Sequence, residues 1–187
     1  MINRIKGALL LDEVVFEEIE HDDSATGQAA VVVIIAAVLG ALGVGFGSNL
    51  LQTAMPSSGS AIVNFIIIVV WAIVAWLVWS GVTYFIGTRL FHGEATYGEM
   101  LRVTGFGFAP IAFMILSAIP CIGFAISLLV MVWSLGAVFI AVRSGLDLSF
   151  GNALVTVLIG WVVYAIGMGI ILSLVFGVSN QILSITG

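Results

Sequence analysis

The stretch RLFHGEATYGEMLR, from Arg89 to Arg102, gathers side chains that could do chemistry. It holds two arginines, two glutamates and a histidine, although only 8% of the 187 residues are charged. A histidine near two carboxylates could bind a metal or act in general acid and base catalysis. His92, Glu94 and Glu99 have no fourth ligand beside them, however, and they lie around one connecting loop. We interpret them as hydrated polar groups and predict no catalytic or metal site here.

The remaining sequence offers little other reactive chemistry. The single cysteine, Cys121, excludes an internal disulfide, and only His21 and His92 could join it as metal ligands, at no recognisable spacing. After Ser24 the charged side chains number six, and they form no basic patch for nucleic acid. These six are Arg89, Glu94, Glu99, Arg102, Arg143 and Asp147. We expect neither an enzyme nor a cofactor.

The composition indicates a membrane protein. Hydrophobic residues make up 61% of the chain, whereas soluble domains are about half apolar and roughly a quarter charged. The net charge of −5 arises in the first 23 residues, where seven acids face Arg4 and Lys6. From Ser24 onward three acids balance three bases. The sequence therefore predicts an all-α integral membrane protein that begins with an acidic segment, residues 1–28.

Five apolar runs approach or exceed the roughly 20 helical residues that cross a bilayer core. They cover residues 29–51, 62–87, 103–119, 121–142 and 153–178, within one transmembrane domain from 29 to 187. The third run is short and contains Gly105, Gly107 and Pro110. Interrupted helices can line a binding site, but a kink is the commoner consequence of a proline. We therefore expect a kink at these three residues and a tight turn at Pro120.

The basic residues predict the orientation of these spans. With five spans, the N-terminal segment and the loops 88–102 and 143–152 share one side of the membrane. All five Lys and Arg residues lie on that side or at its border, and the opposite connections carry no charge. By the positive-inside rule, the N-terminus is in the cytoplasm and the C-terminus is outside.

Helix ends that meet water explain most of the charge between Arg89 and Arg102. Arg89 ends the second span, where a cation faces the negative end of the helix dipole. Thr96 and Glu99 form a T-x-x-E capping box that starts the next helix. Arg102 follows Glu99 by three residues, and we expect its side chain to extend to the lipid headgroups.

An internal repeat relates the second and fourth spans. WSGVTYFIGTR (Trp79–Arg89) aligns with WSLGAVFIAVR (Trp133–Arg143) at a constant offset of 54, and EATYGEML aligns with DLSFGNAL after a one-residue gap. Both units are helix, loop and helix in the same sense, which predicts a parallel repeat of two helical hairpins. The facing loops would then bring charged residues together as structural pairs: Arg89 or Arg143 with Asp147 or Glu94.

Trp79 and Trp133 begin the two aligned segments, ten residues before the corresponding arginines. At helical rise this is about 15 Å, which is too deep for the aromatic belt at the membrane interface. Helix packing and a lipid-lined groove between the repeats are both open interpretations. Gly43 and Gly47 form a GxxxG pattern in the first span, and we expect it to permit close helix contact.

The acidic segment carries apolar residues at helical spacing: Ile2, Ile5, Leu9, Phe16 and Ile19. It could form an amphipathic helix along the cytoplasmic interface. Because its acidity opposes binding to anionic lipid, we favour contact with the helix bundle or with a basic partner. The alternative is that the segment only solvates and orients the first span.

The run GTRLFHGEATYGEMLRVTGFGFAPIAFMILSAIPCIG, followed by a tryptophan-bearing helix and an arginine, resembles the Yip1 domain family of five-span membrane proteins in its short prokaryotic form. The leader LLLDEVVFEEIEHDDSATGQA is similar as well. The resemblance implies a cytoplasmic N-terminus and, in eukaryotic members, membrane trafficking with Rab-type GTPases. The DLYGP-type motif of eukaryotic members is absent from this sequence, so binding of a Rab-type GTPase is not expected.

Three classes of function remain for comparison. An intramembrane enzyme would need a constellation of Ser, His, Asp or Glu that no span contains. As a transporter or channel, the chain would have no ionisable groups within its spans, so its cargo would be uncharged or lipid-like. Lipid translocation and a role as an accessory subunit of a larger complex also remain open. We favour a noncatalytic scaffold or adaptor in a prokaryotic plasma membrane, which binds membrane lipids and other membrane proteins or itself.

Overall fold

The computed structural model describes residues 1–47, 61–119 and 121–186, and all regular structure in these ranges is helical. The elements are α1 (Ile2–Leu9), α2 (Glu13–His21), α3 (Ala25–Gly47), α5 (Ala61–Phe91), α6 (Tyr97–Gly107), the 3-10 helix η1 (Ala109–Ala118), α7 (Gly123–Ser144) and α8 (Phe150–Thr186). Five described segments are long and apolar enough to cross a membrane: Ala25–Gly43, Val69–Phe91, Tyr97–Ala118, Gly123–Ser144 and Phe150–Gly167. The predicted all-α fold with five spans is confirmed.

The boundaries of the described spans differ from the predicted runs by several residues at most spans, the third among them. This span begins at Tyr97 and not at residue 103, because the capping residue Thr96 starts the helix earlier. The end of the first predicted span, most of the connection that follows it, and Pro120 lie outside the described residues.

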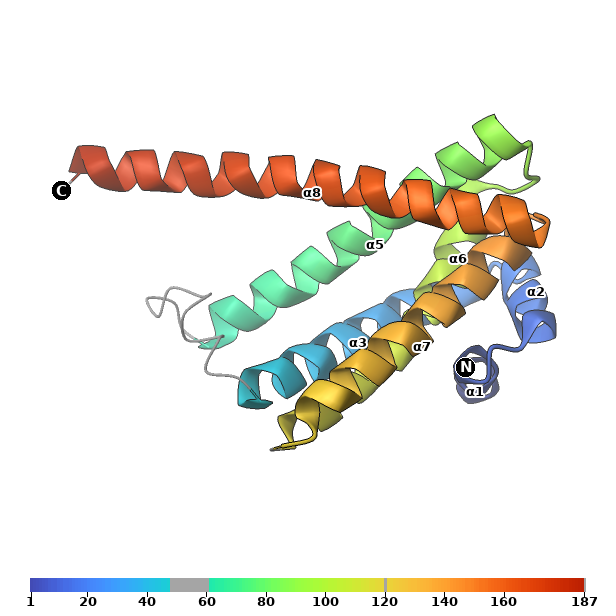
Figure 1. Ribbon diagram of the computed structural model, residues 1–187, viewed down its shortest axis with the longest axis horizontal. Helices are drawn as coiled ribbons and strands as arrows, with labels where there is room; N and C mark the ends of the chain where they lie inside the picture. Colours follow the sequence, from blue (N-terminus) through green and yellow to red (C-terminus); the bar gives the residue numbers. More distant parts are fainter. Residues whose placement is uncertain (48–60, 120, 187) are drawn as a thin grey trace.

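The helices lie close together at one end of the molecule and separate toward the other (Figure 1). At the shared end lie α1, α2 and the loops 92–96 and 145–149, and we call this the polar end. α3, η1 and α7 run close together, whereas α8 packs on α5 and then extends away from α7 (Figure 1). With 37 residues, α8 is about 55 Å long, which exceeds a bilayer core of about 30 Å.

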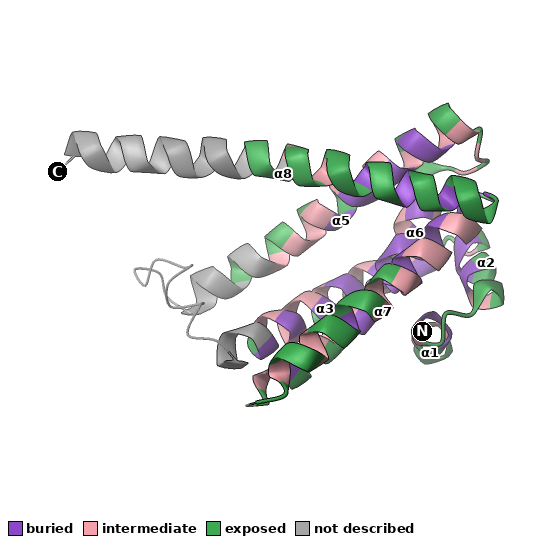
Figure 2. Ribbon diagram, viewed as in Figure 1, coloured by how far each residue is buried: buried purple, intermediate pink, exposed green. Residues whose placement is uncertain are grey.

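The third span is the centre of the bundle. It is 56% buried, whereas the span Phe150–Gly167 is only 22% buried. Met100, Val103 and Phe106 of α6 are fully buried in the core, and Figure 2 shows the buried residues gathered toward the polar end. By contrast, large apolar side chains on α7, such as Leu129, are exposed. Exposed apolar faces of this extent are expected where helices meet lipid.

The third span changes helix type in its middle. α6 ends at Gly107, Phe108 caps it, and η1 begins at Ala109 with Pro110 in its first turn. A 3-10 helix seldom exceeds three or four residues, yet η1 has 10. Proline has no backbone N–H and cannot continue an α-helix from the preceding turn. Gly105 and Gly107 on one side and Pro110 on the other thus flank the change from α to 3-10 geometry.

η1 lies directly against glycines of α3. A Cβ atom on Gly43 would overlap the backbone carbonyl group of Met114, and one on Gly40 would touch the side chain of Ile111. The absence of side chains at these positions lets the two backbones approach. The prediction that Gly43 permits close helix contact is therefore confirmed, and the contact lies within the chain.

Candidate functional site

α1 and α2 cover the polar end of the bundle. Asp12 caps α2 by accepting a hydrogen bond from the backbone N–H of Val14 at 3.1 Å. Ala8, Phe16 and Ile19 are fully buried, and α2 packs against α6 and α7. The acidic segment therefore contacts the helix bundle, as we favoured from its sequence, and it does so as two short helices and not one.

Arg102 joins α6 to the last turn of α2. Its Nε and Nη2 atoms donate to the backbone oxygen of Glu20 at 2.9 and 2.6 Å, and its Nη1 donates to Oδ1 of Asp23 at 2.8 Å. A cation here satisfies carbonyl groups at the negative end of the α2 dipole. The expected extension of Arg102 to the headgroups is wrong, because α2 covers the side chain and leaves the residue 6% exposed.

Arg143 joins α7 to the first turn of α2. Its Nη1 donates to Oε1 of Glu13 in an ion pair. α2 is thus held at its start by α7 and at its end by α6. The sequence analysis paired Arg143 with Asp147 or Glu94, and in the structure its partner is Glu13 instead, because α2 lies over this end of α7.

The loop 92–96 ends in the predicted capping box, which is confirmed. The backbone N–H of Thr96 donates to Oε2 of Glu99 at 2.6 Å, and that of Glu99 donates to Oγ1 of Thr96 at 3.3 Å. Arg89 lies in the last turn of α5, as expected. Within the part of the chain that the structure describes, Arg89, Glu94 and Asp147 form no ion pair.

Glu20 is the most perturbed acid of the polar end. Its pKa is raised to about 7, by burial first and then by the charges of Asp147, Glu99 and Glu17, while His21 acts in the opposite direction. The residue is 5% exposed, so its ionised form has lost most of its contact with water. The polar end therefore contains a carboxyl group that titrates near neutral pH.

Hydrogen bonds join α5 to α6 within the apolar region. Nε1 of Trp76 donates to the backbone oxygen of Leu101 at 3.1 Å and to Oγ1 of Thr104 at 3.2 Å, and the hydroxyl oxygens of Ser80 and Thr104 lie 2.7 Å apart. Such bonds between small polar residues stabilise helix association in lipid. The sequence analysis missed this cluster, although polar residues at 80 and 104 inside apolar runs were an available signal.

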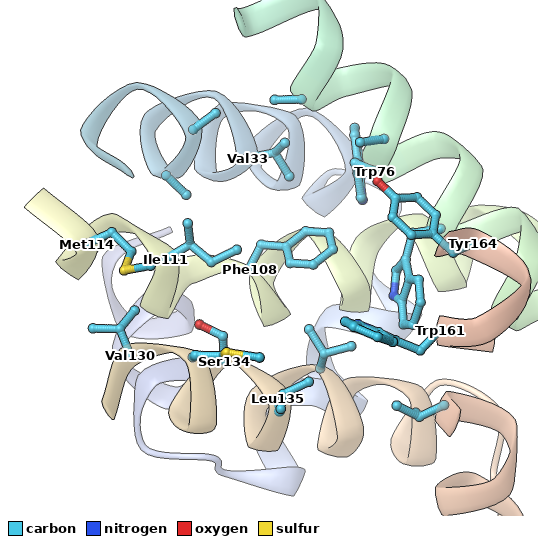
Figure 3. Close-up of a pocket in the computed structure, with 18 residues that line it drawn as sticks. Val33, Trp76, Phe108, Ile111, Met114, Val130, Ser134, Leu135, Trp161 and Tyr164 are labelled. Atoms are coloured by element: carbon cyan, nitrogen blue, oxygen red, sulfur yellow. The ribbon is translucent and has the colours of Figure 1, made fainter. Parts of the chain in front are cut away.

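A cavity of about 470 Å³ lies between α3, α5, η1, α7 and α8 (Figure 3). Its lining contains no carboxylate, amine, guanidinium or imidazole group among the described residues. Aromatic side chains form much of its wall: Trp76, Trp79, Phe108, Trp161 and Tyr164. A partly open, mostly apolar pocket of this size is a usual form of a small-molecule site.

Two polar groups of the cavity wall have no hydrogen-bond partner among the described residues, Nε1 of Trp79 and Oγ of Ser134. The hydroxyl of Ser134 points from α7 toward η1 (Figure 3). Trp79 is 4% exposed, and its ring meets the ring of Tyr164 edge to face, with centroids 5.6 Å apart. Of the two deep tryptophans, Trp79 lines the cavity, whereas Trp133 packs elsewhere and donates to the backbone oxygen of Leu9 at 2.9 Å.

This arrangement is suited to binding. The described residues contain no group of three or more His, Cys, Asp or Glu side chains that could hold a metal ion. The cavity offers mostly apolar walls, and its two hydroxyl-bearing lining residues, Ser134 and Tyr164, have no carboxylate or imidazole base beside them among the described lining residues. Nucleophilic catalysis would need such a base.

Comparison with known proteins identifies one family. The family described as Yip1 domain matches residues 7–174, from α1 into α8. No curated protein and no solved structure matches the chain.

Proposed function

The chain belongs to the Yip1 domain family, and on this premise we propose that it is a noncatalytic multi-pass membrane scaffold or adaptor that binds lipids or other membrane proteins. The observation that carries this proposal is the partly open cavity of about 470 Å³, which five elements of the bundle line and which no charged group lines among the described residues. Exposed apolar side chains on α7 and α8 add a surface on which lipids or partner helices can pack.

Copurification from native membranes tests this proposal. The full chain is extracted in mild detergent, and the retained lipids and proteins are identified by mass spectrometry, with an unrelated five-span protein as the control. We expect a lipid or a membrane protein to remain in near-stoichiometric amount. A chain that retains only the bulk lipid found on the control would contradict the proposed function.

We further propose that the polar end faces the cytoplasm of a prokaryotic cell, with residues 1–28 inside and the C-terminus outside. The positive-inside rule supports this, because all five bases lie near that end. Labelling of Cys121, which is exposed, should report the outside. In a Cys121→Ser background, Glu94→Cys and Ser149→Cys should label only from the inside. Labelling of both from the Cys121 side would reject the topology.

The parallel repeat of two helical hairpins is part of the same proposal. α5 with α6 and α7 with α8 each enclose a five-residue loop, 92–96 and 145–149. In both loops one residue other than glycine has a positive φ, 56° at His92 and 50° at Asp147. The equal loop length supports the repeat, whereas these two residues occupy the first and the third loop position and are not aligned with each other.

The polar end also presents charges that α2 does not use. We propose Arg89, Glu94 and Asp147 as contacts for a cytoplasmic partner, since within the described chain they form no ion pair. All three are exposed in the structure. Binding of a Rab-type GTPase is not part of this proposal.

Translocation of a lipid-like molecule is a second candidate. It is favoured by the position of the cavity between helices that separate toward one end, and by the unusually long 3-10 segment in its wall. A dithionite assay of fluorescent lipid in proteoliposomes tests it. Lipid exchange at the rate of empty liposomes would reject translocation and leave the scaffold proposal in place.

A further inference from the structure

The two short helices of the acidic segment differ in charge. Residues 1–11, which include α1, contain Arg4 and Lys6 and no Asp or Glu, whereas all seven acids of the segment lie between Asp12 and Asp23. Repulsion from anionic lipid is therefore expected for α2 and not for α1. α1 is a short basic helix with apolar side chains, a combination that is typical of helices in the membrane interface.

The turn after α1 lies deeper along the bundle than α2 does. Glu13, at the start of α2, pairs with Arg143 near the end of α7. Two residues earlier in the chain, Leu11 contacts α7 at Gly136, where an added Cβ atom would lie 3.6 Å from its Cδ1. Gly136 precedes Arg143 by about 10 Å of helix. Because α7 has 22 residues, its length of about 33 Å matches a bilayer core of about 30 Å, and the turn lies within the depth of that core.

Two further contacts of α1 agree with this depth. Nε1 of Trp133, which is about 15 Å of helix from Arg143, donates to the backbone oxygen of Leu9 at 2.9 Å. α1 also packs against η1, the half of the third span that lies farther from the polar end. Figure 1 shows α1 nearly end on, so it crosses the direction of α7 as a helix in the plane of the membrane does.

The backbone of the turn is bonded in a way that suits lipid. The N–H groups of Leu10, Leu11 and Asp12 all donate to backbone oxygens of α1, at 3.0, 3.2 and 3.0 Å. Irregular backbone in lipid needs such internal partners, because no water is there to replace them. Leu11 has a φ of 60°, a value that glycine and asparagine adopt more readily. Turns in water favour those residues, whereas this turn carries two leucines.

Apolar side chains of α1 and its turn have no cover from the bundle. Ile2 is 78% exposed, Leu10 is 70% exposed, and Leu11 is exposed as well. Gly136, which Leu11 contacts, lies two helical turns from the exposed Leu129 on the same side of α7. The apolar surface that α7 presents to lipid therefore continues onto the turn.

We propose that α1 lies in the membrane leaflet at the polar end, with the side chains of Ile2, Leu10 and Leu11 among the acyl chains. Lys6 is exposed and forms no ion pair within the described chain, and its long side chain extends to the lipid phosphates. α2, which carries the acids, stays at the aqueous surface. The described lining of the cavity includes no residue of α1, so this inference goes beyond the proposed function.

Fluorescence quenching tests the proposal on the full chain in nanodiscs of phosphatidylcholine brominated on its acyl chains. In a Cys121→Ser background, one fluorophore is attached at Leu10→Cys or at Ile2→Cys. Leu129→Cys, on the exposed face of α7, is the control for lipid contact, and Glu17→Cys, exposed on α2, is the control for water. We expect the fluorophores at positions 10 and 2 to lose most of their fluorescence to the brominated lipid, as at position 129, and the one at position 17 to lose little.

Iodide in the buffer provides the complementary measurement. It should quench the fluorophore at Glu17→Cys and spare those at Leu10→Cys and Ile2→Cys. Iodide quenching at either of these two positions to the extent seen at position 17 would overturn the proposal. Protection from both quenchers would overturn it too, because another protein surface would then cover α1.

A charge in the turn tests whether its leucines hold α1 in the leaflet. With the fluorophore at Ile2→Cys, Leu10→Asp should lower quenching by brominated lipid and raise quenching by iodide, because a carboxylate among acyl chains is costly. Leu10→Met keeps an apolar side chain of similar size and should leave both values unchanged. An equal response of the two variants would contradict insertion of the turn.

Discussion

At the polar end, Arg102 and Arg143 each meet a partner on α2, whereas in the cavity Trp79 and Ser134 meet none among the described residues. The first region connects parts of the chain that are 82 and 130 residues apart in sequence. The second lies where the helices have begun to separate. Both regions contain buried polar groups: the two arginines of the polar end are bonded, although Oγ of Ser144 there has no partner among the described residues, and neither Trp79 nor Ser134 has one.

The difference indicates what each region is for. A buried polar group that is fully bonded fixes a structure, because breaking the bond leaves its partner without a substitute. A buried polar group without a partner adds no hydrogen-bond stability to the fold. We therefore interpret the contacts between α2 and the bundle at the polar end as structural, and the cavity as the region that binds.

The largest effect should follow from removing the buried cation of the polar end. Arg102→Leu leaves the backbone oxygen of Glu20 without its charged donor, and it should cost about 3 kcal/mol of the free energy that holds α2 to the bundle, whereas the exposed carboxylate of Asp23 returns to water. Cleavage by an endoprotease specific for glutamate, which should reach α2 once it detaches, measures the change. Arg89→Leu is the matched control, because Arg89 is exposed and forms no ion pair in the described chain. Equal cleavage of the two variants would show that Arg102 does not hold α2.

The two neighbouring tryptophans provide the next comparison. Trp76→Phe should lower the free energy of unfolding by about 1–2 kcal/mol, because it leaves the backbone oxygen of Leu101 and the hydroxyl of Thr104 without the indole donor. Trp79→Phe removes the same atom from the same helix, but it breaks no bond in the described chain. It should cost less than Trp76→Phe, because both variants lose the same buried ring volume and only Trp76→Phe also breaks hydrogen bonds. Chemical unfolding in mixed micelles measures both, and equal losses would show that the hydrogen bonds of Trp76 add nothing beyond the packing that both variants lose.

The pH dependence of α2 docking should follow the titration of Glu20. Its pKa of about 7 in the folded chain exceeds the ordinary value of 4.5, so the docked state binds the proton more tightly. Docking is then strongest below about pH 4.5, weakens as pH rises toward 7, and changes little above that. The charged groups that face Glu20 are Asp147, Glu99, Glu17 and His21, together with Arg102 on its carbonyl oxygen.

Glu20→Gln tests this dependence by removing the titration. The variant should show the same protection of α2 from proteolysis at pH 5 and pH 8, whereas the wild type should be protected less at pH 8. Cleavage rates are normalised at each pH to those of Arg102→Leu, in which α2 is detached. A wild-type chain with no difference between the two pH values would show that Glu20 does not control docking.

The sequence predicts those features of the fold that depend on local patterns. Apolar run length predicts the five spans, and the T-x-x-E pattern predicts the capping box, because both are properties of neighbouring residues. The glycines of the first span predict a close contact, although not that the neighbour is η1. The spacing of apolar residues in the acidic segment indicates helix, and its charge favours contact with the bundle or with a basic partner over binding to anionic lipid.

The site could not be predicted in the same way, because its contacts join distant parts of the chain. The alignment places Trp79 and Trp133 at equivalent positions, yet the first lines the cavity and the second bonds to Leu9 in α1. The cavity depends on how five elements diverge, which no local pattern records. Arg102 was expected at the headgroups because snorkelling is what an isolated helix would favour, and only the docking of α2 makes burial of this arginine favourable.

The smallest effect is expected at the ion pair between Arg143 and Glu13, whose side chains are 35% and 46% exposed. Arg143→Glu or Glu13→Arg alone should loosen α2 slightly, and the double variant should restore it, with a coupling energy below about 1 kcal/mol because the pair meets solvent. A double-mutant cycle on the rate of proteolysis measures this coupling. Glu94→Arg combined with Arg143→Glu is the control and should restore nothing. If Glu94→Arg restores docking in Arg143→Glu and Glu13→Arg does not, Arg143 pairs with Glu94 of the other loop. The ion pairing at the polar end would then come from the proposed repeat and not from α2.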